Sequence, residues 1–339
     1  MKIVVAGEYN YTMYQEALMH GIQSCGHQAV RLVLPEGRLF HFGLQLRNSR
    51  SLLRCVAQEQ PEVLFLYRVN SFFASTLRLL KWRYPKLCIM VYHNDDPFRG
   101  EFWRHVKNFH FLQSVRHADV TYVYRLVNID EARHCGGRRV KLFMSHYDSR
   151  FDVVPLSADD FKKATDKVVF VGHYEPDGRV ECLDALFRHG VNLHIYGPAH
   201  WADVFSEKQW PVDHCHACVF GDDYRRTINE SSIALAFFST VNRDDYTRRC
   251  FEIPVMGTML VAPRTKSTQT IFTDREDVAL YSNKDELLSL IDYYTAHPDE
   301  RDRIAETAYH HMLEGGQSEQ SRAQMVIDDV EAWRANSQP

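Results

Sequence analysis

The sequence contains no apolar run that approaches the roughly 20 residues needed to cross a bilayer. Its first seven residues carry one basic side chain and a short apolar run, which predicts a buried first strand rather than a secretion signal. The 8 cysteines are scattered through segments expected to form strands and helices, which favours reduced, buried thiols over a disulfide framework. We therefore expect a cytoplasmic protein.

A large excess of one charge is also missing, because 40 Lys and Arg residues face 44 Asp and Glu residues and leave a net charge of −4. The basic residues alternate with acidic ones, so the sequence gives no strong signal for nucleic-acid binding. Hydrophobic residues make up 45% and charged residues 25%, as in an ordinary globular protein. A chain of 339 residues is expected to form two domains.

Three common active-site motifs are absent from the sequence. Without G-x-G-x-x-G after a strand, an ordinary NAD or FAD site is not supported. The sequence has no G-x-x-x-x-G-K-[ST] loop and no G-x-S-x-G elbow, which argues against a P-loop enzyme and an α/β-hydrolase.

Short apolar segments instead alternate with amphipathic ones, which is the pattern of parallel sheets covered by helices on both faces. In the first half the expected strands are Ile3–Ala6, Val30–Leu34, Val63–Tyr67, Leu87–Tyr92, Val120–Tyr124 and Lys141–Met144. The expected helices between them are Tyr11–Cys25, Leu44–Gln58, Phe72–Arg83, Phe102–Arg116 and Asn128–His134.

The pattern resumes after a polar stretch, Ser149–Lys167, which predicts a linker. The expected strands are then Val168–Val171, Leu193–Tyr196, Cys218–Phe220, Ile233–Phe238, Met259–Ala262 and Val278–Tyr281. The expected helices are Arg179–Arg188, Tyr224–Ser231, Arg249–Met256, Lys284–Thr295, Pro298–Leu313 and Ser318–Ala335, with Gly257 as the C-cap of the third.

These elements predict an α/β protein with two doubly wound, Rossmann-like domains facing a central cleft. We expect an N-terminal acceptor domain in residues 1–155 and a C-terminal donor domain in residues 165–318. Residues 319–339 form a C-terminal helix that can pack back on the first domain.

The segment from Asp244 to Val261 carries the strongest chemical signal. Asp244 precedes the expected helix and Glu252 lies in its first turn; carboxylates suit the hydroxyl pairs of sugars and ribose because charged acceptors form strong hydrogen bonds. The N–H groups at the helix start favour a phosphate, to which Arg249 adds a guanidinium fork. The alternative is a solvated charged loop before an ordinary helix.

Arg249-Cys250-Phe251-Glu252 followed by Gly257 resembles the R-x-F-E-x-x-x-x-G segment of CgeB-like glycosyltransferases, relatives of the family 4 enzymes with the GT-B fold. Further stretches in the second half agree with this family in order and spacing. They are Val168–Gly172, Arg179–Leu183, Leu193–Gly197, Gly221–Ser239 and Tyr293–Ala305. In the first half the resemblance is only to GT-B enzymes in general.

The resemblance implies that Glu252 holds the ribose and that Asp244, one methylene shorter than the family's glutamate, contacts the donor sugar. Arg179 is the counterpart of the family's diphosphate-binding arginine; no lysine matches, and Arg243, Arg248 or Arg249 can fill that gap. The resemblance favours a retaining mechanism over an inverting one. The remaining residues expected around the donor are Gly7, Gly172, His173, Tyr174, Tyr196, Gly197, Tyr246 and Phe251.

On the acceptor side, His93-Asn94-Asp95-Asp96-Pro97 closes an apolar strand. His93 or Asp95 is a candidate general base for an acceptor hydroxyl; the alternative is a strand-end turn capped by an aspartate. Gly7, at the end of the first strand, allows close approach of a ligand or simply forms a tight turn.

The segment His214-Cys215-His216-Ala217-Cys218 has side chains that suit zinc, but no second ligand pair is evident elsewhere in the sequence. We therefore predict a packed or loosely exposed loop, no metal and no required cofactor, with a UDP-, GDP- or dTDP-sugar as co-substrate.

The sequence thus predicts a glycosyltransferase that transfers a sugar to a hydroxyl of a glycan, lipid-linked or protein acceptor. Two alternatives stay open: a non-catalytic nucleotide- or sugar-binding protein, and a nucleotide-sugar epimerase on the same scaffold.

Overall fold

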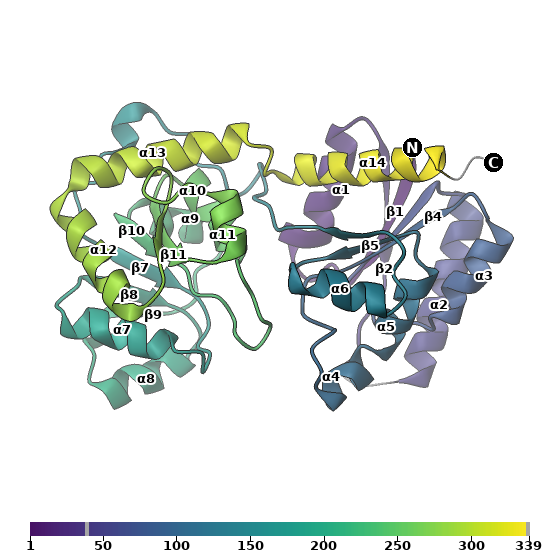
Figure 1. Ribbon diagram of the computed structural model, residues 1–339, viewed down its shortest axis with the longest axis horizontal. Coiled ribbons are helices and arrows are strands. Elements are labelled where there is room, and N and C mark those ends of the chain that lie inside the picture. Colours follow the sequence, from purple (N-terminus) through teal and green to yellow (C-terminus); the bar gives the residue numbers. More distant parts are fainter. Residues whose placement is uncertain (38–40, 337–339) are drawn as a thin grey trace. The chain divides into compact units, whose positions relative to one another are not determined.

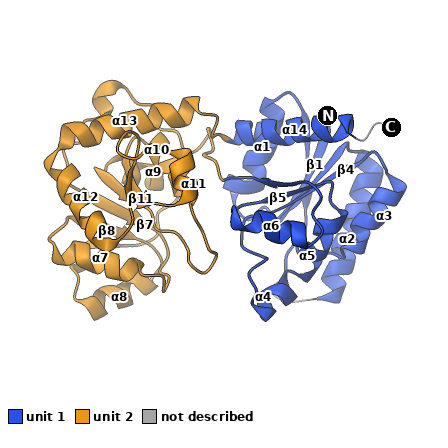
Figure 2. Cartoon of the chain, in the orientation of Figure 1, with its two compact units in different colours: residues 1–144, 319–339 blue, residues 145–318 orange. Residues whose placement is uncertain are grey.

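The computed structural model describes residues 1–37 and 41–336 of the chain. The chain divides into two compact units (Figure 2): unit 1 comprises residues 1–144 and 319–339, and unit 2 comprises residues 145–318. No helix in these described residues has both the length and the apolar character required to cross a membrane.

Unit 1 holds both the first strand, β1, and the last helix, α14 (Figure 1). Its six-stranded parallel sheet has the order β2-β1-β3-β4-β5-β6. Its strands are β1 Lys2–Gly7, β2 Gln28–Val33, β3 Val63–Tyr67, β4 Cys88–His93, β5 Val120–Val123 and β6 Val140–Leu142. Its helices are α1 Ala17–Ser24, α2 Phe42–Glu59, α3 Ser75–Arg83, α4 Phe102–Lys107, α5 Phe109–Ser114, α6 Val127–His134 and α14 Glu319–Ala335; short helical turns are Thr12–Glu16 and Val115–His117.

Unit 2 contains a second six-stranded parallel sheet, in the order β12-β11-β10-β7-β8-β9. Its strands are β7 Val168–Val171, β8 Leu193–Tyr196, β9 Cys215–His216, β10 Ile233–Leu235, β11 Met259–Pro263 and β12 Ala279–Tyr281. Its helices are α7 Arg179–Arg188, α8 His200–Lys208, α9 Gly221–Asn229, α10 Arg249–Val255, α11 Lys266–Ile271, α12 Lys284–Ala296 and α13 Pro298–Glu314; short 3-10 turns are Ala158–Phe161 and Val212–His214.

Both sheets confirm the predicted parallel, doubly wound arrangement. The central strands β3, β4, β5, β7 and β10 are buried along their whole length, because helices cover both faces of each sheet. The edge strands β2 and β6 alternate between partly buried and exposed positions. Each unit has its own hydrophobic core around its central strands.

The strand orders fix where ligands can bind in each unit. In unit 1, β2 lies on one side of β1 and β3 lies on the other. The strand order therefore reverses between β1 and β3, which is the switch point of this unit. Unit 2 has its switch point between β7 and β10. Open α/β sheets bind ligands beyond the carboxyl ends of the strands at such points.

Four local expectations are corrected. Residues 218–220 are not a strand: pairing with β8 occurs earlier, at β9, and Phe220 is exposed at the start of α9. The helix expected at Phe102–Arg116 is divided at Asn108, whose side-chain amide donates to the Arg104 carbonyl at 2.9 Å and caps α4. Helices α8 and α11 were not expected. Helix α8 has only three buried apolar residues among its 9 positions, and α11 has 6 residues that are mostly polar.

Candidate functional site

Glu252 lies in the first turn of α10, and the exposed fraction of this residue is only 4%. The Tyr224 hydroxyl donates to its Oε1 at 2.5 Å, and Arg248 donates to its Oε2 at 2.5 Å. Burial and the neighbouring Glu252 raise the pKa of the Tyr224 phenol, so this hydroxyl stays protonated and acts as a donor. A carboxylate oxygen has two acceptor positions, which leaves each oxygen capacity for a further hydroxyl.

Arg248 also pairs with a second buried carboxylate, Asp152, from the segment before β7. Burial raises the pKa of Asp152 to about 7, and repulsion from Glu252 acts in the same direction against the attraction of Arg248. The Arg248 guanidinium thus forms ion pairs with two carboxylates that are both largely buried. This arrangement fixes the start of α10 and the orientation of Glu252.

Arg249 connects α10 to the switch point of unit 2. Its Nε donates to the carbonyl of Val171, the last residue of β7, at 2.6 Å, and its Nη1 lies 4.0 Å from Glu252 Oε1. Its side chain is 30% exposed, so the guanidinium remains accessible. A partly exposed arginine beside a buried carboxylate can bind the phosphate and the ribose of one nucleotide together.

The loop between β10 and α10 separates the neighbouring carboxylates Asp244 and Asp245. Asp245 is hydrogen-bonded to the start of α11. Its Oδ2 accepts from the Ser267 hydroxyl at 2.6 Å, and its carbonyl accepts from the Thr265 hydroxyl. Asp244 is partly exposed, and its N–H donates to the Ser239 carbonyl at 2.8 Å. Arg243 adopts the left-handed conformation that this turn requires (φ 54°). The contact of Asp244 with a donor sugar stays a prediction.

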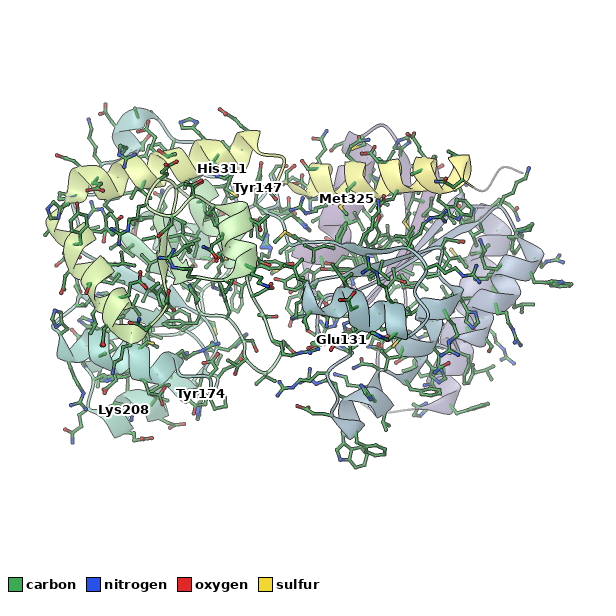
Figure 3. All side chains as sticks on the ribbon, viewed as in Figure 1. Glu131, Tyr147, Tyr174, Lys208, His311 and Met325 are labelled. Atoms are coloured by element: carbon green, nitrogen blue, oxygen red, sulfur yellow. The ribbon has the colours of Figure 1, made fainter. Side chains whose placement is uncertain are left out.

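The loop after β7 holds three of the predicted donor residues and is closed by Arg179. Arg179 is buried, donates to both oxygens of Asp177 and donates to the His173 carbonyl at 2.6 Å. Its hydrogen bonds therefore hold the conformation of this loop. The contact of Arg179 with a diphosphate stays a prediction. His173 is exposed. Tyr174, labelled in Figure 3, packs its ring edge-on against His200 of α8.

The ends of β7 and β8 approach each other at two glycines. The Gly172 N–H donates to the Tyr196 carbonyl at 2.9 Å, and the Gly172 carbonyl accepts from Trp201 Nε1 at 2.8 Å. A Cβ on Gly197 would lie 2.4 Å from that same Gly172 oxygen, so only glycine fits there. The Trp201 ring is fully buried and belongs to the core.

Tyr246 and Phe251 belong to the buried core next to this site. Both side chains are completely buried, and their rings pack edge to face with centroids 5.8 Å apart. Gly257, at the end of α10, takes the left-handed conformation expected of a helix cap (φ 73°). The R-x-F-E-x-x-x-x-G segment therefore consists of polar groups facing the switch point and apolar groups that anchor the helix.

Unit 1 has a polar pocket of about 160 Å³ beyond its own switch point. Residues that follow β1, β2, β3 and β4 line it, together with one lysine of α4: Glu8, Glu36, Gly37, Arg68, Asn70, Asp95 and Lys107. Arg68 pairs with Asp95 at 2.7 Å. Gly7 ends β1 in this unit, where an added Cβ would lie 2.5 Å from the Gln15 side-chain nitrogen.

His93 and Asp95, the predicted acceptor-side pair, lie together in this unit, but their environments differ. His93 is buried, which lowers its pKa to about 3; its Nδ1 accepts from the Asp95 N–H at 3.2 Å and its Nε2 faces the Asn70 amide at 3.3 Å. Burial alone would raise the pKa of Asp95, but nearby positive charges, Arg68 above all, outweigh it and the pKa is lowered. Asp95 is thus the ionised carboxylate at this pocket, and His93 is its neutral support.

Glu36 was missed from the sequence. Its carboxylate accepts from the N–H groups of Asn70 and Ser71 at 2.8 to 3.1 Å and from the Ser71 hydroxyl at 2.9 Å. Burial raises its pKa to about 7, although these hydrogen bonds act in the opposite direction. Polar residues directly after β2 and β3 were the signal that could have identified Glu36 and Arg68, since parallel strands end at one edge.

Both histidines of the segment His214 to Cys218 stack on His194 of β8. His194 of β8 stacks on His214 with ring centroids 4.3 Å apart, and its Nδ1 lies 2.9 Å from His216 Nε2. Within the described part of the chain, no three His, Cys, Asp or Glu side chains are grouped to hold a metal ion. Residues 214–216 are partly buried at the edge of the sheet, whereas Ala217 and Cys218 are exposed.

Comparisons with known proteins agree with this geometry. Residues 179–328 match the family model described as Glycosyl transferase-like. No curated protein matches the sequence significantly.

Several solved structures share the fold over nearly the whole chain. HepE from Anabaena, solved in complex with UDP-glucose, has a TM-score of 0.71 at 12% identity, covering 98% of this chain and 100% of that one. Sucrose-phosphate synthase from Thermosynechococcus elongatus has a TM-score of 0.70 at 10% identity, with coverage of 99% and 100%. A protein described as a UDP-N-acetylglucosamine 2-epimerase from Listeria monocytogenes has a TM-score of 0.62 at 10% identity, with coverage of 99% and 97%.

The two parallel sheets and these likenesses show the GT-B fold. The family match covers α7 to most of α14 and includes every polar residue described around Glu252 except Asp152. Residues 179–328 are therefore glycosyltransferase-like, and the chain has the GT-B fold.

Proposed function

We propose that this protein is a cytoplasmic, CgeB-like glycosyltransferase that binds a nucleoside diphosphate sugar in unit 2. The observation that carries the proposal is the buried Glu252 carboxylate beside the accessible guanidinium of Arg249, at the switch point between β7 and β10. A carboxylate for ribose hydroxyls and a cation for phosphate are the two groups that such a donor requires. The Glycosyl transferase-like match over the same residues supports it.

In this proposal Glu252 accepts hydrogen bonds from the ribose hydroxyls, and Arg249 neutralises the diphosphate. Asp244 contacts the sugar, and Arg179 acts on the diphosphate side by fixing the loop from Gly172 to Tyr174. Uridine diphosphate sugars are the first donors to test, because HepE was solved with UDP-glucose.

The bond between C1 of the sugar and the diphosphate oxygen breaks as C1 bonds to the acceptor oxygen, and the proton of the acceptor hydroxyl passes to the released diphosphate. Arg249 stabilises the negative charge that develops on the leaving diphosphate, which is the main requirement of a retaining transfer. Asp95 is ionised and lies at the rim of the unit 1 pocket, where it can accept a hydrogen bond from an acceptor hydroxyl.

The decisive variant is Glu252→Gln, which keeps the shape of the side chain and removes its charge. Loss of charge-assisted hydrogen bonds to ribose is expected to weaken nucleotide binding about 10- to 100-fold. Glu207→Gln on the exposed face of α8 is the matched control and should bind like the parent chain. Calorimetric titration with UDP, GDP and dTDP measures both; equal affinity of Glu252→Gln and the parent would contradict the assignment.

Product analysis separates this function from its alternatives. A transferase is expected to hydrolyse its donor slowly without an acceptor, whereas a binding protein leaves the donor intact. A nucleotide-sugar epimerase, favoured only by the shared fold of the Listeria protein, yields an isomerised donor as its sole product. Chromatography of donor incubated with the enzyme distinguishes these results.

A further inference from the structure

Helix α4 and the start of α5 in unit 1 expose large apolar side chains to solvent. The exposed fractions are 71% for Phe102, 75% for Trp103, 42% for Val106 and 53% for Phe109. No residue of α4 is buried. An amphipathic helix that packs on its own core would bury such side chains, so α4 presents them outward instead.

Ring contacts extend this exposed region to a second part of the unit. Phe109 packs against His110, which meets Phe73 edge-on at 5.4 Å between ring centroids. Phe73 in turn contacts Phe42 at 5.5 Å, and Phe42 at the start of α2 is 61% exposed. The aromatic surface is defined here by Phe42, Phe73, Phe102, Trp103, Val106, Phe109 and His110.

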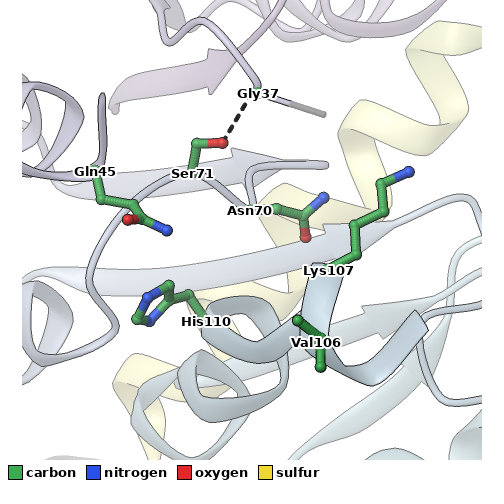
Figure 4. A pocket seen from close by; sticks show the side chains of 7 residues that line it. All are labelled: Gly37, Gln45, Asn70, Ser71, Val106, Lys107 and His110. Atoms are coloured by element: carbon green, nitrogen blue, oxygen red, sulfur yellow. Dashed lines mark hydrogen bonds between the residues drawn. The ribbon is translucent and has the colours of Figure 1, made fainter. Parts of the chain in front are cut away.

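The aromatic surface borders a small hollow shown in Figure 4. Val106, Lys107 and His110 line this hollow from α4 and α5, opposite Gln45 of α2. Asn70 and Ser71 line it from the loop after β3, and Asn70 and Lys107 also line the polar pocket of this unit. Apolar and cationic groups therefore lie next to each other here.

The charge of this region differs from that of the whole chain. Residues 99–110 contain Arg99, Arg104 and Lys107 but only one acidic residue, Glu101, whereas the chain as a whole has a net charge of −4. Glu101 contacts both arginines, at 3.1 and 3.4 Å, and Lys107 is exposed. Within residues 99–110 the excess of charge is therefore positive, on the same short segment that exposes the rings.

We propose that the aromatic surface docks on an anionic lipid bilayer, with its rings at the level of the headgroups. Trp and Phe side chains insert at the boundary between headgroups and acyl chains, and adjacent basic residues are attracted to anionic lipids. The positive charge of residues 99–110 complements the negative charge of anionic headgroups, although the chain as a whole is negatively charged. This inference does not depend on the proposed glycosyltransferase activity.

Flotation with vesicles tests the proposal on the full chain. Vesicles of equal parts phosphatidylcholine and phosphatidylglycerol are expected to carry the protein upward, and pure phosphatidylcholine should carry much less. Phe102→Ser with Trp103→Ser should lower partitioning by at least about tenfold for each ring, and Lys107→Gln by about fivefold. Trp82→Ser is the matched control, because Trp82 on α3 is 78% exposed and lies outside the aromatic surface.

Thermal unfolding of each variant verifies that it remains folded, since all the substituted side chains are exposed. The proposal is overturned if the parent chain does not bind anionic vesicles, or if the Phe102 and Trp103 substitutions leave binding unchanged. Sedimentation of the protein without vesicles tests whether the aromatic surface instead binds a second copy of the chain. Self-association that these substitutions abolish, without vesicle binding, would assign the surface to a second copy of the chain.

Discussion

Arg248 is the residue on which the order of the candidate site depends most directly. It neutralises two carboxylates, Asp152 and Glu252, that are both largely removed from water. Leaving a buried charge unpaired costs far more than losing a surface ion pair. The pairing therefore concerns the stability of unit 2 as well as the position of the Glu252 carboxylate.

Arg248→Met is expected to lower the free energy of unfolding by about 3–5 kcal/mol. Adding Asp152→Asn should restore part of this loss, because one of the two unpaired charges is removed. Arg226→Met is the control, since Arg226 and Asp223 form an exposed ion pair on α9 whose loss should cost below about 1 kcal/mol. Urea unfolding measures all three; equal effects of the Arg248 and Arg226 substitutions would contradict this account.

Glu36 predicts a pH dependence of stability in unit 1. Its pKa rises from an ordinary value of 4.5 to about 7 in the folded chain, so the folded state binds more protons than the unfolded state between these values. The resulting stabilisation is complete below about pH 4.5 and is lost as the pH rises through 7. Glu36→Gln should flatten this slope.

Hydrogen exchange of unit 1 amides is the suitable measurement for Glu36. Asp152 has a raised pKa over a similar range but lies in unit 2, so a global unfolding curve would mix the two. Asp152→Asn therefore serves as the control and should leave the unit 1 profile unchanged. An identical slope for Glu36→Gln and the parent would refute the prediction.

At the scale of elements, the close approach of β7 and β8 restricts which residue can end β8. Gly197→Ala is expected to lower the free energy of unfolding by about 1–3 kcal/mol, because the new Cβ would lie 2.4 Å from a backbone oxygen that cannot move freely. Gly100→Ala, where an added Cβ has no neighbour within 4 Å, should be nearly neutral. Chemical denaturation of both variants tests this; a neutral Gly197→Ala would show that the strand ends separate readily.

At the scale of the whole molecule, the last helix of the chain belongs to the first core. Its Asp329 accepts from the Tyr122 hydroxyl at 2.6 Å, pairs with Lys141 and is buried in unit 1. Val326, Val330 and Ala323 of α14 are fully buried as well. The two cores should therefore respond separately to substitutions near the C-terminus.

Asp329→Ala is expected to destabilise unit 1 by about 1–3 kcal/mol, because it leaves the Tyr122 hydroxyl buried without its acceptor. Unit 2 should be unaffected, although it precedes α14 directly in the sequence. Limited proteolysis followed by mass spectrometry locates the weakened unit. Faster cleavage within residues 145–318 would contradict the division into two cores.

The sequence was sufficient for much of the fold and for the helix that carries Glu252. Buried parallel strands such as β3 and β7 are recognisable as uniformly apolar runs, and Gly257 marks the end of α10 by its backbone preference. Short elements and edge strands were harder to predict from the sequence. Strand β9 depends on pairing with β8, and Asn108 interrupts α4 through a side-chain hydrogen bond that periodicity does not reveal.

The local sequence by itself determined which residue types stand at each strand end, because side-chain chemistry and helix or strand period are properties of neighbouring residues. Only the tertiary structure decided their protonation and partners. His93 is neutral because it is buried, Glu36 holds the loop after β3, and Asp152 reaches Arg248 from 96 positions away. Burial and contacts between distant segments set the electrostatic environment of each group, and neither exists before the chain folds.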